Sequence, residues 1–208
     1  MSTYHKIRNV YRRSEDDHLI TRSLGFQRPV FEFLENAAWD FTEKVDGMNM
    51  RAVFDGEGGF RVAGKSDRAQ IPGDLNDHMY DVFAGFDAEF EFEGRPVTFY
   101  GEGYGAGIQK GGSYSQEKRF ILFDIRVDQR WLSRSLVLAF SGILNIPVVP
   151  LLFTGTLSEG VRFAAHGFSS EVAETEMEAE GLIGKPTVEL FDEYGERVIV
   201  KLKGKDFR

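Results

Sequence analysis

The sequence has 208 residues, 42% of them hydrophobic and 13% aromatic, and carries a formal net charge of −8 at pH 7. This length and apolar content predict a single compact domain over residues 1–208. The absence of cysteine excludes disulfides and thiolate metal sites. The sequence does not begin like a signal peptide and has no apolar run of about 18 residues. We therefore expect a cytoplasmic protein without a membrane partner.

The charge is unevenly distributed along the chain. The stretches "HKIRNVYRR" and "VKLKGKDFR" are basic, whereas "EVAETEMEAE" contains five glutamates. A net negative charge argues against non-specific coating of nucleic acid, because such binding depends on phosphate neutralisation. The basic stretches nevertheless allow a local cationic groove, and the alternative is that these charges lie on scattered solvated faces.

The expected elements are mixed. Residues 48–54 and 60–65 flank the turn-rich "DGEGG" and predict a hairpin. A helix is expected from Asp74 as N-cap, and another over about 133–145, ahead of Pro147. Further strands are expected in "VTFYGE", "RFILFDIRV", "EGLIGK", "VELFD" and "RVIVKLK", the last two joined through "EYGE" as a second hairpin. This irregular order predicts an α+β fold with largely antiparallel sheets, not a doubly wound one.

Residues 59–66, "GFRVAGKS", match the G-x-x-x-x-G-K-[ST] pattern of a phosphate-binding P-loop. A P-loop needs a loop between its glycines and a helix after its lysine. Here "FRVA" is typical of a strand, and Pro72 and Gly73 follow Lys65 too closely for a helix to begin there. The sequence therefore argues against a P-loop.

Lys44 is a better candidate for chemistry. It lies in "TEKVDGMNMR", a stretch that otherwise indicates a strand, beside Glu43 and just before an Asp-Gly turn. A lysine amine becomes nucleophilic only when neighbouring cations or desolvation lower its pKa from about 10.4. Lys201 and Lys203 alternate along a predicted strand, so their ammonium groups point to one side, where they could supply such cations or bind a polyphosphate. Taken alone, this segment would be better interpreted as a surface strand with solvated lysines.

Several motifs in order give this sequence a family resemblance. "EKVDG" resembles the K-x-D-G motif of the covalent nucleotidyltransferases, which include DNA ligases, RNA ligases and mRNA capping enzymes. "YGEGYG", "FILFDI", "EGLIGKP" and "VKLKGKDF" follow in the family's order over residues 43–207. The sequence "GEGYGAGIQKGG" is most similar to the corresponding motif in RNA ligases of the T4 phage RNA ligase 2 type. The resemblance covers the catalytic domain only, and implies a nucleotidyltransferase (ATP-grasp-like) fold with flanking helices.

The resemblance also implies roles for particular residues. Lys44 would form a phosphoramide with AMP, and Lys201 and Lys203 would bind phosphate oxygens and orient the pyrophosphate. Glu180 would help to bind a divalent metal, Mg²⁺ or Mn²⁺. The other cofactor-binding candidates are Glu43, Asn49, Glu102 and Phe123. Glu43 adjoins the nucleophile, Glu102 would bind the ribose hydroxyls, and Phe123 would stack on adenine. The alternatives are that Phe123 is a core phenylalanine and that Asn49 is a polar strand position.

The sequence departs from the family pattern in two places. Family members commonly carry an arginine after the hairpin that follows the nucleophile, where this sequence offers Lys65, with Arg68 three residues later; which of them acts is open. Family ligases also usually carry an appended C-terminal or OB-fold domain, which we do not expect here. A minimal ligase, or one that relies on a partner protein to engage its substrate, is therefore expected.

The resemblance predicts an ATP-dependent polynucleotide ligase, with RNA ends or a nicked duplex as the substrate. A minimal DNA ligase is the alternative with the same chemistry. A GTP-using capping enzyme is a third option, although such enzymes usually need an OB-fold. From a different class, the chain could be a nucleotide-binding accessory module of RNA repair without turnover, although the complete set of motif residues argues against such a loss.

Overall fold

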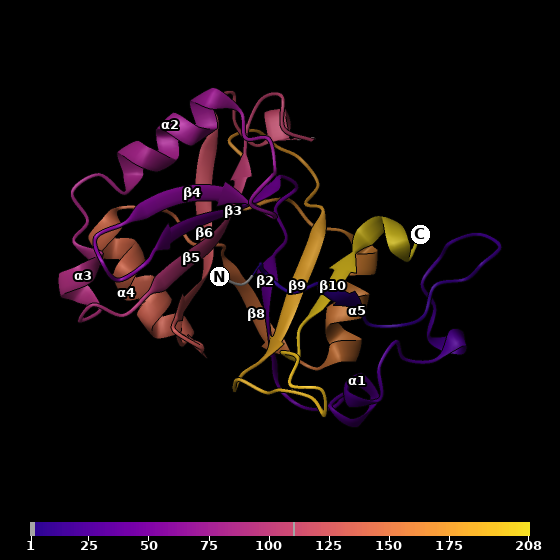
Figure 1. Ribbon diagram of the computed structural model, residues 1–208. Coiled ribbons are helices and arrows are strands. Elements are labelled where there is room, and N and C mark those ends of the chain that lie inside the picture. Colours follow the sequence, from indigo (N-terminus) through magenta and orange to yellow (C-terminus); the bar gives the residue numbers. More distant parts are fainter. Residues whose placement is uncertain (1–2, 110) are drawn as a thin grey trace. The chain divides into compact units, whose positions relative to one another are not determined.

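The computed structural model describes residues 3–109 and 111–208, and the chain divides into two compact units. Unit 1 comprises residues 1–4, 46–149 and 173–175, and unit 2 comprises residues 5–45, 150–172 and 176–208. Each unit contains one five-stranded sheet (Figure 1). The expectation of a single domain over the whole chain stays a prediction.

The sheet of unit 1 is entirely antiparallel, with the strand order β4-β3-β5-β6-β7. Every second residue of β3 from Met48 to Phe54, together with Val97 and Phe99 of β5, belongs to the hydrophobic core of this unit, so one face of the sheet is apolar. Their bounds are β3 (Met48–Phe54), β4 (Phe60–Gly64), β5 (Val97–Tyr104), β6 (Arg119–Val127) and β7 (Arg130–Trp131).

Within its described residues, unit 1 has three helices, α2 (Gly73–Val82), α3 (Ala88–Glu91) and α4 (Arg134–Leu144), and a short 3-10 turn, η2 (Gly111–Ser113). Residues of α2 and α4 pack on the apolar sheet face and complete a core rich in phenylalanine. Ser133 caps the start of α4, and Asn145 ends it in the left-handed conformation, with φ of 52°.

The sheet of unit 2 has the order β1-β10-β9-β2-β8. β1 runs parallel to β10, and every other pair is antiparallel, so the first strand of the chain lies beside the last. The strands are β1 (Arg8–Asn9), β2 (Trp39–Glu43), β8 (Leu151–Gly155), β9 (Gly181–Pro186) and β10 (Val200–Lys203).

Helix α5 (Leu157–His166) packs on the sheet of unit 2. Its Thr156 and Glu159 form a capping box, and Gly160 faces Phe41 so closely that a side chain there would collide with the ring. The unit also contains α1 (Pro29–Phe33) and the 3-10 turns η1 (Arg22–Leu24) and η3 (Gly204–Asp206). None of the helices in the described ranges has the length and apolar character needed to cross a membrane.

Most of the expected elements are confirmed. The first hairpin, the helix ahead of Pro147 and the strands at 97–102, 119–127 and 180–185 are all present. Asp74 as a helix N-cap is wrong: Pro72 takes that position with φ of −54°, and the Asp74 carboxylate binds Lys118 instead. The largely antiparallel α+β class is confirmed.

The second expected hairpin is also wrong in its extent. Residues 188–192 form no strand, and the pairing is reduced to one bridge between Phe191 and Arg197. The carboxylate of Asp192 accepts hydrogen bonds from the backbone of Tyr194 and Glu196, which curls this segment into a loop. The following strand, β10, takes β9 and β1 as its partners instead.

Candidate functional site

Lys44 lies directly after β2, not inside a strand as the sequence pattern indicated. The ladder of β2 ends at Glu43, and β3 begins at Met48, so residues 44–47 form a break between two strands. The backbone N–H of Lys44 donates to the carbonyl of Gly181, 2.9 Å away, at the start of β9. This bond fixes the backbone of Lys44 beside the residue that follows Glu180.

Glu180 joins two of the predicted lysines. Its Oε2 accepts from Nζ of Lys44, and its Oε1 is ion-paired with Nζ of Lys203. The Glu180 side chain is 12% exposed, against 20% for Lys44 and 23% for Lys203. Burial alone would raise the pKa of Glu180, but the two ammonium groups outweigh it and lower that pKa from its usual value.

Lys201 completes what we call the lysine group: Lys44, Lys201, Lys203 and Glu180. The neighbours of the two strand lysines on β10, Val200 and Leu202, are buried, so the expected alternation that puts both lysines on one side is confirmed. Burial lowers the pKa of Lys201, and the charges of Lys203 and Lys44 lower it further. With three ammonium groups and one carboxylate, the group suits a polyanion.

Glu43 points away from this group, although it adjoins Lys44 in the sequence. It is 1% exposed, and its carboxylate accepts from the hydroxyl of Ser170 and, at 2.8 Å, from the backbone N–H of Glu171. Burial raises the pKa of Glu43, and these hydrogen bonds offset part of that rise. Its side chain therefore anchors the segment around residue 170, and a role in cofactor binding stays a prediction.

Asn49 and Glu102 lie opposite each other in unit 1, on β3 and β5. Oδ1 of Asn49 is buried and has no hydrogen-bond partner among the described residues, so an acceptor stands unused beside Glu102. Gly47 approaches the same place: a Cβ added there would lie 2.3 Å from the carbonyl oxygen of Gly103 and 2.9 Å from Cγ of Glu102. The glycine of the K-V-D-G stretch is thus required by a close backbone approach.

Phe123 lies at an irregularity in the pairing of β6 with β5. Tyr100 pairs with Asp124 and Gly101 with Leu122, so Phe123 has no direct partner across the strands. The ring of Tyr4 packs edge-on against Phe123, with centroids 5.1 Å apart, and its hydroxyl bonds Asp124. Phe123 is half-buried, and its role in stacking on a base stays a prediction.

Lys65 and Arg68 are both exposed in the segment after β4. The residues between the two glycines of the P-loop pattern form β4, and α2 begins only at Gly73, so a P-loop geometry is absent from this described segment. The segment is held by Arg51, which is fully buried and donates to Gly64 O at 2.8 Å and Asp67 Oδ1 at 2.7 Å.

Three further residues of these regions, Arg51, Tyr4 and Ser170, were not predicted from the sequence. Arg51 lies two residues after Asn49, so strand alternation places both on one sheet face, and this signal could have found it. Ser170 and Tyr4 act through contacts distant in sequence, which no local pattern indicates. Lys110, the lysine of the G-I-Q-K motif, lies outside the described residues.

The residues as described contain no group of three or more histidine, aspartate or glutamate side chains able to hold a metal ion. Glu180 is the carboxylate of the lysine group. Mg²⁺ commonly binds through one or two carboxylates together with substrate phosphates, so a single carboxylate among three lysines fits a metal that arrives with a nucleotide.

Comparison with known proteins bears on the family and on the fold. The sequence model of the RNA ligase family matches residues 37–203. A comparison with curated protein sequences gave no match.

Solved structures of Naegleria gruberi RNA ligase share the fold. A mutant solved with ATP and Mn has a TM-score of 0.69 and 18% identity, over 100% of this chain and 57% of that one. The structure with PPi has a TM-score of 0.66 and 19% identity, over 99% of this chain and 60% of that one. A mutant with AMP and Mn has a TM-score of 0.63 and 19% identity, over 86% of this chain and 53% of that one. The chain therefore spans less than two thirds of these structures.

Proposed function

Because the chain belongs to the RNA ligase family, as the match over residues 37–203 shows, we propose that it is an ATP-dependent RNA ligase. The lysine group carries this proposal. It places a lysine from the K-V-D-G stretch against a carboxylate, with two further lysines on the strand that ends the motif series. Such a group can bind a triphosphate and present an amine to it.

In the proposed first step, Nζ of Lys44 attacks the α-phosphorus of ATP. A P–N bond forms, the bond from the α-phosphorus to the bridging oxygen breaks, and pyrophosphate leaves with the electron pair. Lys44 must enter this step as a neutral amine, so the ammonium that Glu180 binds first loses a proton, and the attacking nitrogen loses a second. Lys201 and Lys203 oppose the negative charge that builds on the leaving group.

The proton from Lys44 goes to solvent or to the pyrophosphate, not to Glu180. The two lysines lower the pKa of Glu180, so its carboxylate holds a proton weakly at neutral pH. Glu180 is therefore better suited to orient Lys44 and to help hold Mg²⁺ or Mn²⁺. When bound, such an ion would neutralise charge on phosphate oxygens.

The remaining residues receive roles on the nucleoside and on the RNA. We assign Glu102 and the unused acceptor of Asn49 to hydroxyl and amine groups of the bound nucleoside, and Phe123 to the base. AMP then passes from Lys44 to a 5′-phosphate, whose oxygen displaces the lysine nitrogen. A 3′-hydroxyl finally attacks that phosphate, and AMP leaves.

Lys65 is assigned to a later step on the RNA, since it is exposed on a segment that the buried Arg51 holds in place. Lys65→Ala should then leave self-adenylation largely intact and weaken sealing. Arg68→Ala, on the same exposed segment, is the matched variant that decides which of the two cations contacts RNA phosphate. Steady ADP production dependent on Lys65 would contradict this assignment.

The experiment that tests the activity is transfer of label from α-labelled ATP, GTP or NAD to the protein. We expect labelling by ATP with Mg²⁺ or Mn²⁺, loss of it in Lys44→Ala, and retention in Lys205→Ala, an exposed lysine just beyond the lysine group. Labelling by GTP instead would indicate a capping enzyme. A complete lack of labelling would favour an accessory module without turnover.

The substrate is tested with two nicks that differ only in the sugar at the 3′ terminus. The 2′-hydroxyl is the group by which a protein can distinguish RNA from DNA there, so faster sealing of the 3′-ribonucleotide nick is expected. With a net charge of −8, polynucleotide binding should be sensitive to salt, and added salt should inhibit sealing before self-adenylation. Equal or faster sealing of the all-DNA nick would favour a DNA ligase.

We also propose that pre-adenylated RNA is joined more readily than 5′-phosphate RNA, because the pre-adenylated end needs only the last step. A partner protein that engages the RNA, and a location in the cytoplasm, remain part of the proposal. Reconstitution of sealing by the chain alone on a nicked RNA duplex would remove the need for a partner.

A further inference from the structure

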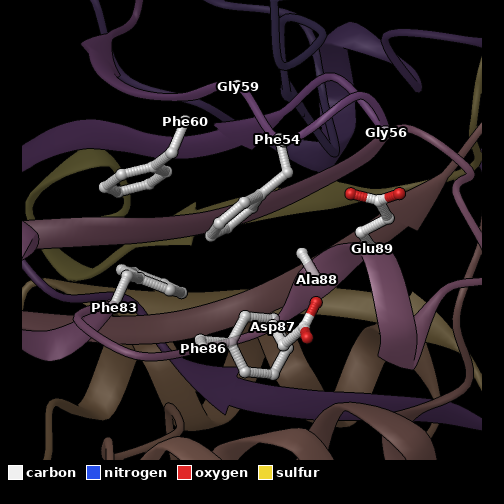
Figure 2. Close-up of a pocket in the computed structure, with 10 residues that line it drawn as sticks. Phe54, Gly56, Gly59, Phe60, Phe83, Phe86, Asp87, Ala88 and Glu89 are labelled. Carbon is white, nitrogen blue, oxygen red and sulfur yellow. The ribbon is translucent and has the colours of Figure 1, made fainter.

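Unit 1 contains a cavity of about 200 Å³ at the hairpin end of its sheet, between the turn at residues 55–59 and the start of α3. Four phenylalanines line it, Phe54 and Phe60 from the hairpin strands and Phe83 and Phe86 from the segment after α2 (Figure 2). Asp87 and Glu89 bring carboxylates to the same cavity. None of these six residues has a part in the proposed ligase chemistry.

The four rings form one cluster around Phe54. Its centroid lies 4.6 Å from that of Phe60, 5.9 Å from Phe83 and 5.8 Å from Phe86. Phe60 and Phe86 are only half-buried, so ring surface remains available at the cavity. Aromatic faces carry partial negative charge and attract cations.

The surroundings of the cavity are strongly acidic. A Cβ on Gly56 would lie 2.2 Å from the carbonyl oxygen of Gly94, so the hairpin turn and the segment after α3 touch. Backbone N–H groups of Glu57 and Gly59 lower the pKa of Asp55, which keeps this carboxylate ionised. Residues 55–59 and 87–95 together contain six carboxylates and one arginine: Asp55, Glu57, Asp87, Glu89, Glu91, Glu93 and Arg95.

This chemistry selects the kind of ligand. Phosphates and nucleic acid are repelled by the carboxylates, and the volume is below the roughly 300–1,000 Å³ of pockets for drug-sized ligands. One cationic side chain matches both the size and the charge. Arginine fits better than lysine, because its planar guanidinium can stack on a ring while it binds a carboxylate through two N–H groups.

We propose that this cavity binds an arginine side chain from a basic segment of a partner protein. Phe90 supports a protein partner: it is 78% exposed in α3, between Glu89 and Glu91, and offers apolar surface next to the acidic rim. The guanidinium lies against the phenylalanine rings and pairs with Glu89, while neighbouring basic residues meet the outer carboxylates. The interaction leaves the lysine group and its chemistry unchanged.

The test uses a fluorescent nine-residue peptide of alternating arginine and glycine, with a lysine version of equal charge for comparison. We expect the arginine peptide to bind more tightly, and Glu89→Gln to weaken its binding by about fivefold, as loss of a charge-assisted pair of about 1 kcal/mol implies. Glu91→Gln is the matched control: it removes the same charge from the same short helix, outside the cavity lining.

A second variant, Ala88→Leu, fills the cavity without changing any charge. It should abolish the preference for arginine over lysine, with thermal unfolding used to confirm that the variant folds. If Ala88→Leu does not fold, the comparison of peptide binding by Glu89→Gln and Glu91→Gln still tests the proposal, because both substitutions alter exposed side chains. Three results would each overturn the proposal. They are equal weakening of arginine-peptide binding by Glu89→Gln and Glu91→Gln, equal binding of both peptides, and displacement of the arginine peptide by ATP.

Self-adenylation by ATP, measured on the same preparations, separates this inference from the proposed function. The three variants lie outside the lysine group, so their labelling should equal that of the wild-type chain. Loss of peptide binding with labelling retained supports an independent site. An absence of labelling in all preparations would count against ligase activity and leave the peptide result to stand alone.

Discussion

The ammonium group of Lys44 is ion-paired with Oε2 of Glu180 while the backbone of Lys44 is bound to Gly181. Main chain and side chain of the candidate nucleophile are thus fixed by two consecutive residues of another segment. Because the second oxygen of Glu180 binds Lys203, one carboxylate determines where two ammonium groups lie.

The first prediction concerns stability and pH in Glu180→Gln. Lys44 and Lys203 lower the folded-state pKa of Glu180, so its stabilising contribution is complete above the unfolded pKa of about 4.3 and is lost as pH falls through the folded value. The difference in unfolding free energy between wild type and variant should therefore shrink from about pH 7 to about pH 3, as measured by urea unfolding. Glu176→Gln, in the same acidic run, is exposed and should show little such change.

The second prediction concerns the coupling of charges on β10. The pKa of Lys201 is lowered first by burial and then by the charges of Lys203 and Lys44, so Lys203→Met should raise it without restoring its ordinary value. An NMR titration of the Lys201 ε-methylene group measures the change. Lys205→Met, an exposed lysine two residues further on, should leave it much less affected; equal shifts in both variants would contradict the arrangement.

The third prediction concerns the glycine of the K-V-D-G stretch. A methyl group at Gly47 would collide with backbone at 2.3 Å, so Gly47→Ala should destabilise the chain by about 1–3 kcal/mol and reduce adenylation. Gly73→Ala is the control, because a Cβ at that position meets no atom within 4 Å and helix α2 has already begun there. Thermal or urea unfolding should find this variant unchanged or slightly stabilised.

The fourth prediction tests what Glu43 does. Ser170→Ala removes one of the hydrogen bonds to its buried carboxylate, which should cost about 1 kcal/mol of stability. Adenylation at saturating ATP should change by less than about twofold, since Glu43 acts here as an anchor. A large rise in the KM for ATP with unchanged stability would instead support the predicted cofactor contact.

The lysine group shows what sequence alone can establish. Strand alternation was sufficient to place Lys201 and Lys203 on one side of β10, because that periodicity is local. The pairing of Glu180 with both Lys44 and Lys203 joins residues 136 and 23 positions apart, and only the sheet order β10-β9-β2 creates it. Local chemistry thus predicted the three lysines and the family resemblance predicted Glu180, whereas tertiary pairing determines their partners.

The errors have the same origin. Residues 188–192 have the β-branched and aromatic content of a strand, but β10 pairs with β9 and with the distant β1 instead. Intrinsic preference was overridden by competition for partners, which the sequence does not display. Asp74 was expected to cap a helix because aspartate commonly does so, yet Lys118 binds its carboxylate.

The position of β1 beside β10 has a consequence for synthesis on the ribosome. Almost all of unit 1 is the continuous segment 46–149, which can begin to fold as soon as it emerges. Strands β1 and β2 must wait for β9 and β10, made more than 130 residues later, before their sheet can form. The lysine group therefore comes together only after Lys203 has emerged from the ribosome, so ribosome-bound chains that stop before residue 181 should lack any capacity for self-adenylation.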